Sequence, residues 1–205
     1  MYYKEYEKHD LPETLVSQLD YTRVQLELEG RNSDTFRTLG NIDTAVTDIP
    51  ACLSPEALQE LLDKNEHRLR ADDDARAFFR YDLWVSEDRE NQNILQNEIS
   101  RFMPGASPSG FFWYPNGSHM GWHTNANRPG ERLFCTYVKE GGKSFFRYRH
   151  PDTGKIYTCW EKEGWNFRIF LVGNRAENYL WHCVYAAVER MSFGFYLPLE
   201  LMKHD

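Results

Sequence analysis

The sequence predicts an α+β fold, in which a helical N-terminal half precedes an antiparallel jelly roll. Up to residue 103, apolar residues recur at helical spacing, and after the breaker cluster PGASPSG at 104–110 they lie in short runs rich in aromatic and β-branched residues. Turn-forming residues separate these runs, as in a sandwich or barrel. We therefore expect a mainly helical support region at 1–105 and the jelly-roll core at 106–205, together forming one compact unit.

Three segments carry the helical pattern. SPEALQELLDKNEHRLR at 54–70 opens with Ser54 as a candidate N-cap and Pro55 at the first helical position. EDRENQNILQNEISRFM at 87–103 repeats the apolar spacing, and LPETLVSQL is a shorter candidate. The segment ARAFFRYDLWVS between the two longer helices is ambiguous and is compatible with a strand. We expect the helices to pack on one face of the jelly roll.

The second half predicts seven or eight strands. The runs are FFWYPNG, RLFCTYVKE, KSFFRYRHP, KIYTCWEKE, WNFRIFLV, YLWHCVYA and RMSFGFYL, separated by turn signals rich in Pro, Gly, Asn and Asp. Strands at this spacing are typical of an antiparallel jelly roll or barrel.

Composition excludes some classes of protein. The apolar content of 41% and the aromatic content of 15% are incompatible with a disordered chain. The formal charge of −7 argues against a nucleic-acid partner, because binders of the phosphate backbone usually display a basic face. The N-terminus lacks the apolar core of a secretory signal, and no apolar run has the length of a membrane span. We therefore expect a cytoplasmic protein with no membrane partner; the sequence does not indicate the oligomeric state.

A candidate site begins in WHCVYAAVERMSFGFYL at 181–197. If 180–185 and 189–197 are strands joined by a short turn, His182 and Arg190 are cross-strand partners. Arg190 and Ser192 then share one strand face, where an arginine beside a serine suits a carboxylate. A solvent-facing polar side of an ordinary strand explains the same pattern equally well.

The stretch GWHTN at 121–125 adds two potential metal ligands. His123 and Asn125 lie on one side of a predicted strand end, as a chelating pair requires. Two histidines and one oxygen ligand, with open positions, are the arrangement of non-haem Fe(II) oxygenases. We expect the nearby His119 to be a surface histidine.

Over residues 105–197 the sequence resembles the 2-oxoglutarate-dependent Fe(II) dioxygenases, whose core is a double-stranded β-helix of the cupin-like jelly-roll type. It is similar to the small members of that superfamily found in phage and marine microbial sequence. Their pattern is a tyrosine, a glycine, His-x-Asp/Glu, a distal histidine, and an arginine eight to ten residues further, often followed by x-Ser. The matching residues here are Tyr114, Gly117, His123, Asn125, His182, Arg190 and Ser192.

The resemblance implies a role for each matching residue. His123, Asn125 and His182 would be the catalytic Fe(II) ligands. Arg190 would bind the distal carboxylate of the cosubstrate 2-oxoglutarate, supported by Ser192 and Tyr114. The activity implied is hydroxylation of an unidentified substrate, a small molecule or a peptide, with release of succinate and CO2.

Asn125 departs from the family pattern, which has an acid at this position. The Asn125 carbonyl oxygen binds a hard metal without the charge of a carboxylate. Asn125 is therefore a weak ligand in an active hydroxylase, or leaves its place to water or halide as in halogenating members, or marks an inactive jelly-roll binding module. Asp152, in the turn HPDTG, is a conceivable substitute acid, although a turn carboxylate more commonly caps its own backbone.

Overall fold

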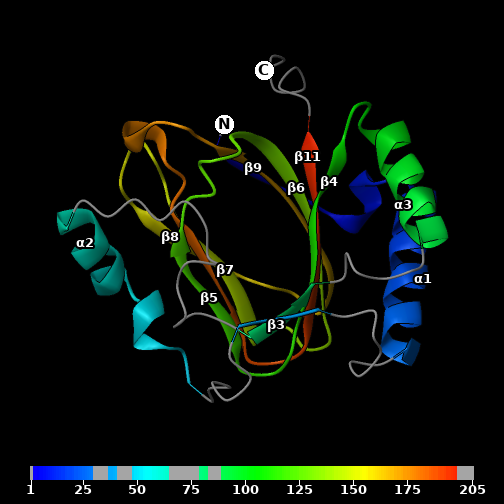
Figure 1. Cartoon of the computed structure of the whole chain (residues 1–205), viewed down its shortest axis with the longest axis horizontal. Helices are drawn as coiled ribbons and strands as arrows, with labels where there is room; N and C mark the ends of the chain where they lie inside the picture. Colours follow the sequence, from blue (N-terminus) through cyan, green and yellow to red (C-terminus); the bar gives the residue numbers. More distant parts are fainter. Residues whose placement is uncertain (1, 30–36, 41–47, 65–78, 83–88, 198–205) are drawn as a thin grey trace.

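The computed structural model describes residues 2–29, 37–40, 48–64, 79–82 and 89–197, which form two facing antiparallel sheets (Figure 1). The large sheet has the order β1-β9-β6-β11-β4-β3-β2. Its strands are β1 (Tyr3–Tyr6), β2 (Arg37–Gly40), β3 (Phe79–Asp82), β4 (Ser107–Tyr114), β6 (Gly130–Val138), β9 (Gly164–Val172) and β11 (Arg190–Leu197).

The small sheet has the order β5-β10-β7-β8. Its strands are β5 (Ser118–His123), β7 (Ser144–Arg149), β8 (Ile156–Trp160) and β10 (His182–Ala186). From β4 to β11 the chain passes back and forth between the sheets at every step except β7–β8, a hairpin within the small sheet, and this is the winding of a jelly roll. The predicted α+β jelly roll is therefore confirmed.

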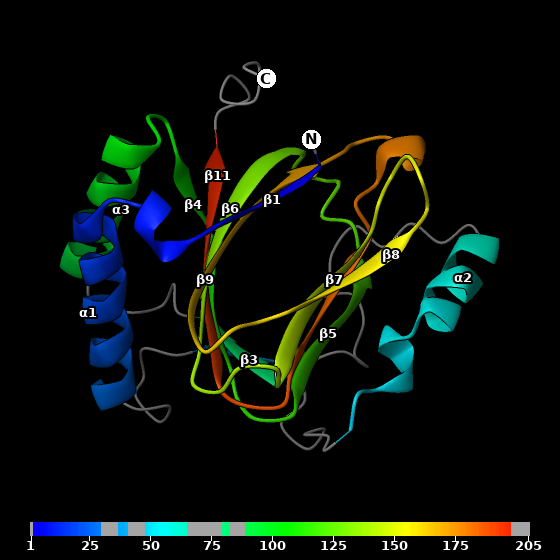
Figure 2. The ribbon, with the colours of Figure 1, turned by 180° about the vertical axis from the view of Figure 1, so that it is seen from behind.

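The N-terminal region contributes strands as well as helices. β1 extends the large sheet beside β9 (Figure 2), and β3 pairs with β4, so the ambiguous segment around 79–82 is a strand. The helices are α1 (Glu13–Glu29), α2 (Pro55–Asp63) and α3 (Arg89–Phe102), with short 3-10 turns η1 (Lys8–Asp10), η3 (Ala51–Leu53) and η6 (Ala176–Asn178). α1 is longer than the sequence pattern predicts.

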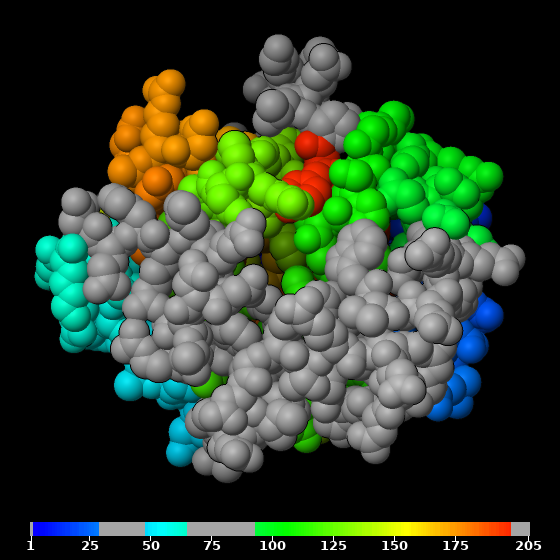
Figure 3. All heavy atoms as spheres, in the orientation of Figure 1, coloured from blue at the N-terminus to red at the C-terminus, as the bar shows by residue number. Residues whose placement is uncertain are grey.

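Two of the helices cover the outer face of the large sheet. Leu15 and Leu19 of α1 and Leu95 and Ile99 of α3 are fully buried against the apolar face of this sheet. α2 lies instead on the opposite side of the molecule, outside the small sheet (Figures 1 and 3). The helices thus cover two faces rather than the single face expected.

α2 begins as the sequence predicts. The Ser54 hydroxyl accepts a hydrogen bond from the Ala57 backbone N–H at 3.1 Å, and Pro55 occupies the first turn. Leu53 and Leu58 are buried against Trp122 and other residues on the outer face of the small sheet. The Trp122 indole N–H also donates to the Ser54 carbonyl at 3.0 Å, which fixes this helix start next to β5.

β10 and β11 do not form the predicted hairpin. β10 pairs with β5 and β7 in the small sheet, whereas β11 pairs with β4 and β6 in the large one. The chain therefore crosses between the sheets after Ala186. His182 and Arg190 are not cross-strand partners, and they meet only across the space between the sheets.

The predicted division of β11 into two faces is correct. Met191, Phe193 and Phe195 point outward into the core beneath α1 and α3. Arg190 and Ser192 point to the interior between the sheets, as alternation along a strand requires.

None of the described helices combines the length and the apolar character that crossing a bilayer requires.

Candidate functional site

A cavity of about 280 Å³ lies between the two sheets. Both sheets and the loop after β5 contribute to its wall, and its rim includes the exposed residues Asn127 and Arg128. Among the described residues that line it there are four arginines and no Asp or Glu. The lining residues are Ser109, Phe112, Tyr114, Met120, His123, Asn125, Asn127, Arg128, Arg132, Phe134, Phe146, Arg168, Phe170, His182, Val184, Arg190, Ser192 and Tyr196.

The two predicted histidines lie together in this cavity. His123 ends β5 and His182 begins β10, and the two residues are register partners across neighbouring strands. Their ring centroids are 4.1 Å apart, and each residue is only 3% exposed. Although 58 residues lie between His123 and His182 along the chain, the antiparallel pairing brings both imidazoles to one end of the small sheet.

Backbone carbonyls fix the orientation of both rings. His123 Nδ1 donates to the Gly121 carbonyl and His182 Nδ1 donates to the Leu180 carbonyl, each at 2.8 Å. A carbonyl only accepts, so the proton resides on Nδ1 and Nε2 carries the lone pair. Burial, and then the neighbouring His123, lower the pKa of His182 well below its ordinary value. His182 is therefore neutral at pH 7, which is the form that binds metals.

Asn125, on the loop after β5, lies next to the His182 ring. Its backbone has φ 54°, a left-handed conformation that asparagine tolerates better than most residues. Its Nδ2 donates to His182 Nε2 at 3.0 Å. A half-turn of the side-chain amide places Oδ1 where Nδ2 now lies, so the residue can present an oxygen to a metal held by the histidines.

The donor set fits a divalent transition metal, with one weakness. Two imidazole nitrogens and one oxygen ligand are the donors that Fe(II) oxygenase sites use. The described residues nowhere gather three His, Cys, Asp or Glu side chains into a metal-binding group. The third donor that the described residues offer beside the two histidines is therefore the neutral amide of Asn125.

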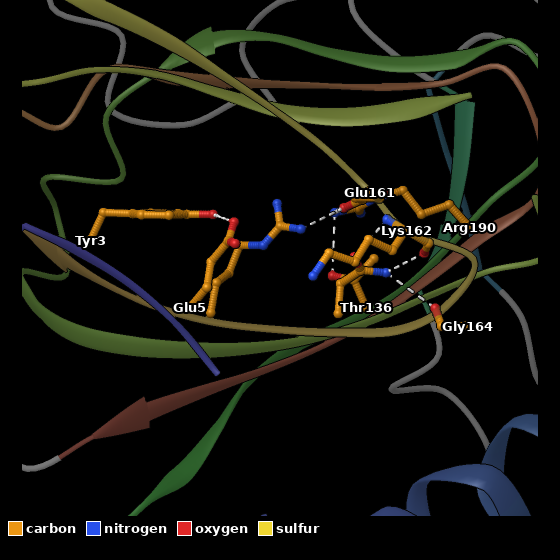
Figure 4. Close-up of polar contacts among 9 residues, drawn as sticks. Tyr3, Glu5, Thr136, Glu161, Lys162, Gly164 and Arg190 are labelled. Atoms are coloured by element: carbon orange, nitrogen blue, oxygen red, sulfur yellow. Dashed lines mark hydrogen bonds and ion pairs between the residues drawn. The ribbon is translucent and has the colours of Figure 1, made fainter. Parts of the chain in front are cut away.

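Arg190 enters the cavity already bound to a carboxylate that the sequence analysis did not identify. Its Nε and Nη2 donate to Glu161 at 2.9–3.1 Å, and Nη2 also lies 3.4 Å from the Thr136 hydroxyl (Figure 4). Burial acts to lower the pKa of Arg190, but the charge and hydrogen bonds of Glu161 outweigh it and raise that pKa. Arg190 and Glu161 thus form a buried ion pair at the floor of the cavity.

Glu161 holds a second arginine, which the sequence analysis also missed. Arg168 Nη2 lies 3.2 Å from Glu161 Oε1, and the side chains of the two residues are 3% and 0% exposed. Glu161 follows β8 directly, and Trp160 before it is exposed. If the alternation of side chains along β8 continues by one residue, Glu161 points inward because Trp160 points outward. This pattern could have identified Glu161 from the sequence, but EKEG resembles a turn.

The other predicted cosubstrate residues line the same cavity. Tyr114 pairs with Arg190 across β4 and β11, and the Arg190 guanidinium lies 5.1 Å from the Tyr114 ring centroid. Ser192 lies one inward position further along β11. All six predicted site residues therefore border one space, although the carboxylate receptor differs from the simple Arg-x-Ser pair expected.

The positions of Asp152 and His119 differ from those that the sequence suggested. Asp152 is exposed and accepts a hydrogen bond from the Tyr2 hydroxyl at 3.0 Å, so it lies outside the cavity lining and is not a substitute metal ligand. His119 is only 3% exposed, which corrects the prediction of a surface histidine. It belongs to β5 and pairs with Tyr185, whose side chain packs on the outer side of the small sheet.

Comparisons with known proteins give little further information. No protein-family model matches the sequence, and no curated protein matches it. Among solved structures, a prolyl-4-hydroxylase from Pseudomonas putida is similar over 96% of this chain and 91% of that chain, with a TM-score of 0.48 and 15% identity. Function therefore has to be inferred from the residues of the cavity.

Proposed function

We propose that the protein is an Fe(II)- and 2-oxoglutarate-dependent oxygenase. The observation that supports this most strongly is the contact between two buried histidines, each held by a backbone carbonyl through Nδ1, in a cavity that also contains buried arginines. A metal-chelating end and an anion-binding end in one enclosed space are what a keto-acid cosubstrate requires.

Each predicted residue has a part in this proposal. His123 and His182 hold the metal through Nε2, and Asn125 completes the set through Oδ1. Arg190, Ser192 and Tyr114 line the cavity at the arginine-rich end that would take the distal carboxylate of 2-oxoglutarate. Fe(II) held by these residues would supply oxygen activation, in which 2-oxoglutarate and O2 give succinate and CO2 and one oxygen atom is inserted into a substrate C–H bond.

The chain's own contribution is orientation and exclusion of water. Phe146 and Phe170 stack at 5.0 Å, and each ring lies 5.4 Å from the His182 ring. This aromatic packing holds the imidazole and makes this part of the cavity wall apolar, and beside an apolar wall the electrostatic interactions of the arginines are stronger than in water. A small molecule or a peptide side chain would enter past the exposed rim at Asn127 and Arg128.

The experiment is an anaerobic titration with Fe(II) and 2-oxoglutarate. The proposal predicts the weak visible charge-transfer band of a chelated keto acid, followed on exposure to oxygen by succinate formation. The band should be lost in His123→Ala and retained in His9→Ala, because His9 is exposed. Absence of both the band and stoichiometric metal uptake in the unaltered protein would refute the proposal.

One observation favours a second candidate, a metal-free module that binds an anionic ligand. Asn125 donates directly to His182 Nε2, which satisfies that nitrogen without a metal, and the described residues offer no acidic ligand in the cavity lining. Equilibrium dialysis separates the candidates. The module takes up a dicarboxylate equally well with and without divalent metal, whereas the oxygenase binds 2-oxoglutarate more tightly when metal is present.

A further inference from the structure

Arg168 has buried donors with no acceptor. The residue is 2% exposed and lines the cavity, and its Nε and Nη1 have no hydrogen-bond partner. Only Nη2 is engaged, by Glu161. An unsatisfied buried donor costs about 1–3 kcal/mol, and more when the group is charged. An anion in the cavity would remove this cost.

Arg190 is less available than Arg168. Its Nε and Nη2, the edge that forms a fork, are both occupied by the Glu161 carboxylate. Glu161 therefore neutralises Arg190 most completely and leaves Arg168 with most of its hydrogen-bonding capacity. The buried group contains two guanidinium groups and one carboxylate, and the exposed Glu5, which pairs in register with Arg168, leaves the Nε and Nη1 of Arg168 without a hydrogen-bond partner.

Arg132 adds a third buried guanidinium group near the rim. It is 6% exposed, its Nε lacks a hydrogen-bond partner, and its Nη2 donates to the Arg128 carbonyl at 2.7 Å. Among the buried charged residues of this group, three guanidinium groups face one carboxylate, and the exposed Glu5, the register partner of Arg168 on β1, adds a second carboxylate beside it.

The sheet register gives the position of Arg168 relative to the histidines. Arg168 and Phe170 are alternate inward residues of β9, about 7 Å apart along the strand. Phe170 contacts the His182 ring, while the Arg168 guanidinium lies 5.4 Å from the centre of the Phe146 ring. Arg168 is therefore one step deeper than the histidines, a separation that a short dicarboxylate can bridge.

We propose that Arg168, assisted by Arg132, is the carboxylate receptor of the cavity, and that Arg190 supports it through Glu161. The ligand class is a short dicarboxylate, whose oxygens would accept from the unpartnered donors of Arg168 and Arg132. The carboxylate belongs either to the keto-acid cosubstrate or to the substrate. The proposal deepens the proposed function by naming the recognition residue, but the receptor itself needs no metal.

The test uses glutarate, which has the five-carbon dicarboxylate skeleton but no keto group to chelate a metal. Binding is measured by calorimetry on the full chain after chelator treatment. We expect Arg168→Gln to weaken glutarate binding at least tenfold, and Arg168→Lys to weaken it less because the charge is kept. Arg175→Gln is the matched control, since Arg175 is exposed, directly precedes η6 and is not among the residues that line the cavity.

Circular dichroism of each variant shows whether the fold is intact, and Arg168→Lys keeps the ion pair with Glu161 if Arg168→Gln does not fold. Unchanged glutarate affinity in the folded Arg168 variants, or no binding by the unaltered protein, overturns the receptor. Competition between glutarate and 2-oxoglutarate assigns the carboxylate to the cosubstrate, and simultaneous binding assigns it to the substrate.

The outcome is independent of the iron chemistry. Glutarate binding that depends on Arg168, without any Fe(II)-dependent band, supports the receptor and refutes the oxygenase. Conversely, 2-oxoglutarate turnover that survives Arg168→Gln, together with an unchanged glutarate affinity of that variant, supports the oxygenase and refutes the receptor.

Discussion

Asn125 controls the strength of the proposed metal site. It is the third donor beside His123 and His182, and it donates to His182 through Nδ2 at 3.0 Å. Before it can bind a metal, the amide has to turn and give up this hydrogen bond, and it then contributes no charge. Both effects weaken metal binding relative to a carboxylate at the same place.

Replacing Asn125 by Asp should therefore tighten divalent metal binding. We expect at least a tenfold lower Kd for Mn(II), because the variant adds a negative charge beside two imidazoles and loses the donor that occupies His182 Nε2. The measurement is a titration followed by the signal of free Mn(II) in electron paramagnetic resonance.

Asn127→Asp is the matched control for this prediction, because Asn127 lines the same cavity at its exposed rim. It should change the Mn(II) affinity much less. Equal affinities of the Asn125→Asp variant and the unaltered protein would show that residue 125 does not contact the metal.

At the residue scale, the sequence predicted the site where local patterns carry the information. His123 and Asn125 are two residues apart, and Arg190 and Ser192 alternate on one strand, so their common faces follow from strand periodicity. Glu161 and Arg168 were missed because each owes its role to the other. A carboxylate in a turn and an arginine in a strand look like surface residues until the fold brings them together.

At the scale of elements, Glu161 joins segments that are not neighbours in the chain. It follows β8 of the small sheet and binds Arg168 of β9 and Arg190 of β11, both in the large sheet. This ion-paired group is the polar link between the sheets at the floor of the cavity. Removing the carboxylate leaves two guanidinium groups buried without a counter-charge.

Glu161→Gln should lower the free energy of unfolding by about 3–5 kcal/mol, the usual cost of breaking a buried ion pair from one side. Glu163→Gln, two residues further along at an exposed position, should change it by less than about 0.5 kcal/mol. Urea unfolding followed by tryptophan fluorescence measures both. Equal stabilities would mean that the arginines find other partners when Glu161 is lost.

The order of the elements shows where local patterns fail. The turn between β10 and β11 is short enough for a hairpin, but the chain uses it to cross between sheets, and pairing across a jelly roll leaves no local sequence signal. α1 extends to Glu29, although the pattern predicts a shorter helix. The exposed apolar residues Tyr21, Val24 and Leu28 obscure its buried stripe.

For the whole molecule, the buried histidine pair makes stability depend on pH. The pKa of His182 is lowered in the folded protein, so between that pKa and about 6.5 the unfolded chain binds more protons than the folded one. The free energy of unfolding therefore has its full value above pH 6.5 with respect to this group. It decreases as the pH falls from 6.5 toward the pKa of His182 in the folded protein.

The metal-free protein should lose about 1 kcal/mol of unfolding free energy between pH 6.5 and 5.5 through this one group. Urea unfolding at the two pH values measures the loss. His182→Gln should reduce the loss, and His9→Gln, at an exposed position, should leave it unchanged. An equal loss in His182→Gln and the unaltered protein would show that other groups cause the acid sensitivity.

The whole account depends on a metal held by His123 and His182 in a cavity whose deeper end binds a carboxylate. The most direct measurement is a crystal structure grown without oxygen in the presence of Mn(II) and 2-oxoglutarate, with anomalous scattering recorded for manganese. We predict one anomalous peak bound to Nε2 of both histidines, and keto-acid density that runs from it toward Arg168. A peak elsewhere, or none beside an ordered keto acid, would contradict the account.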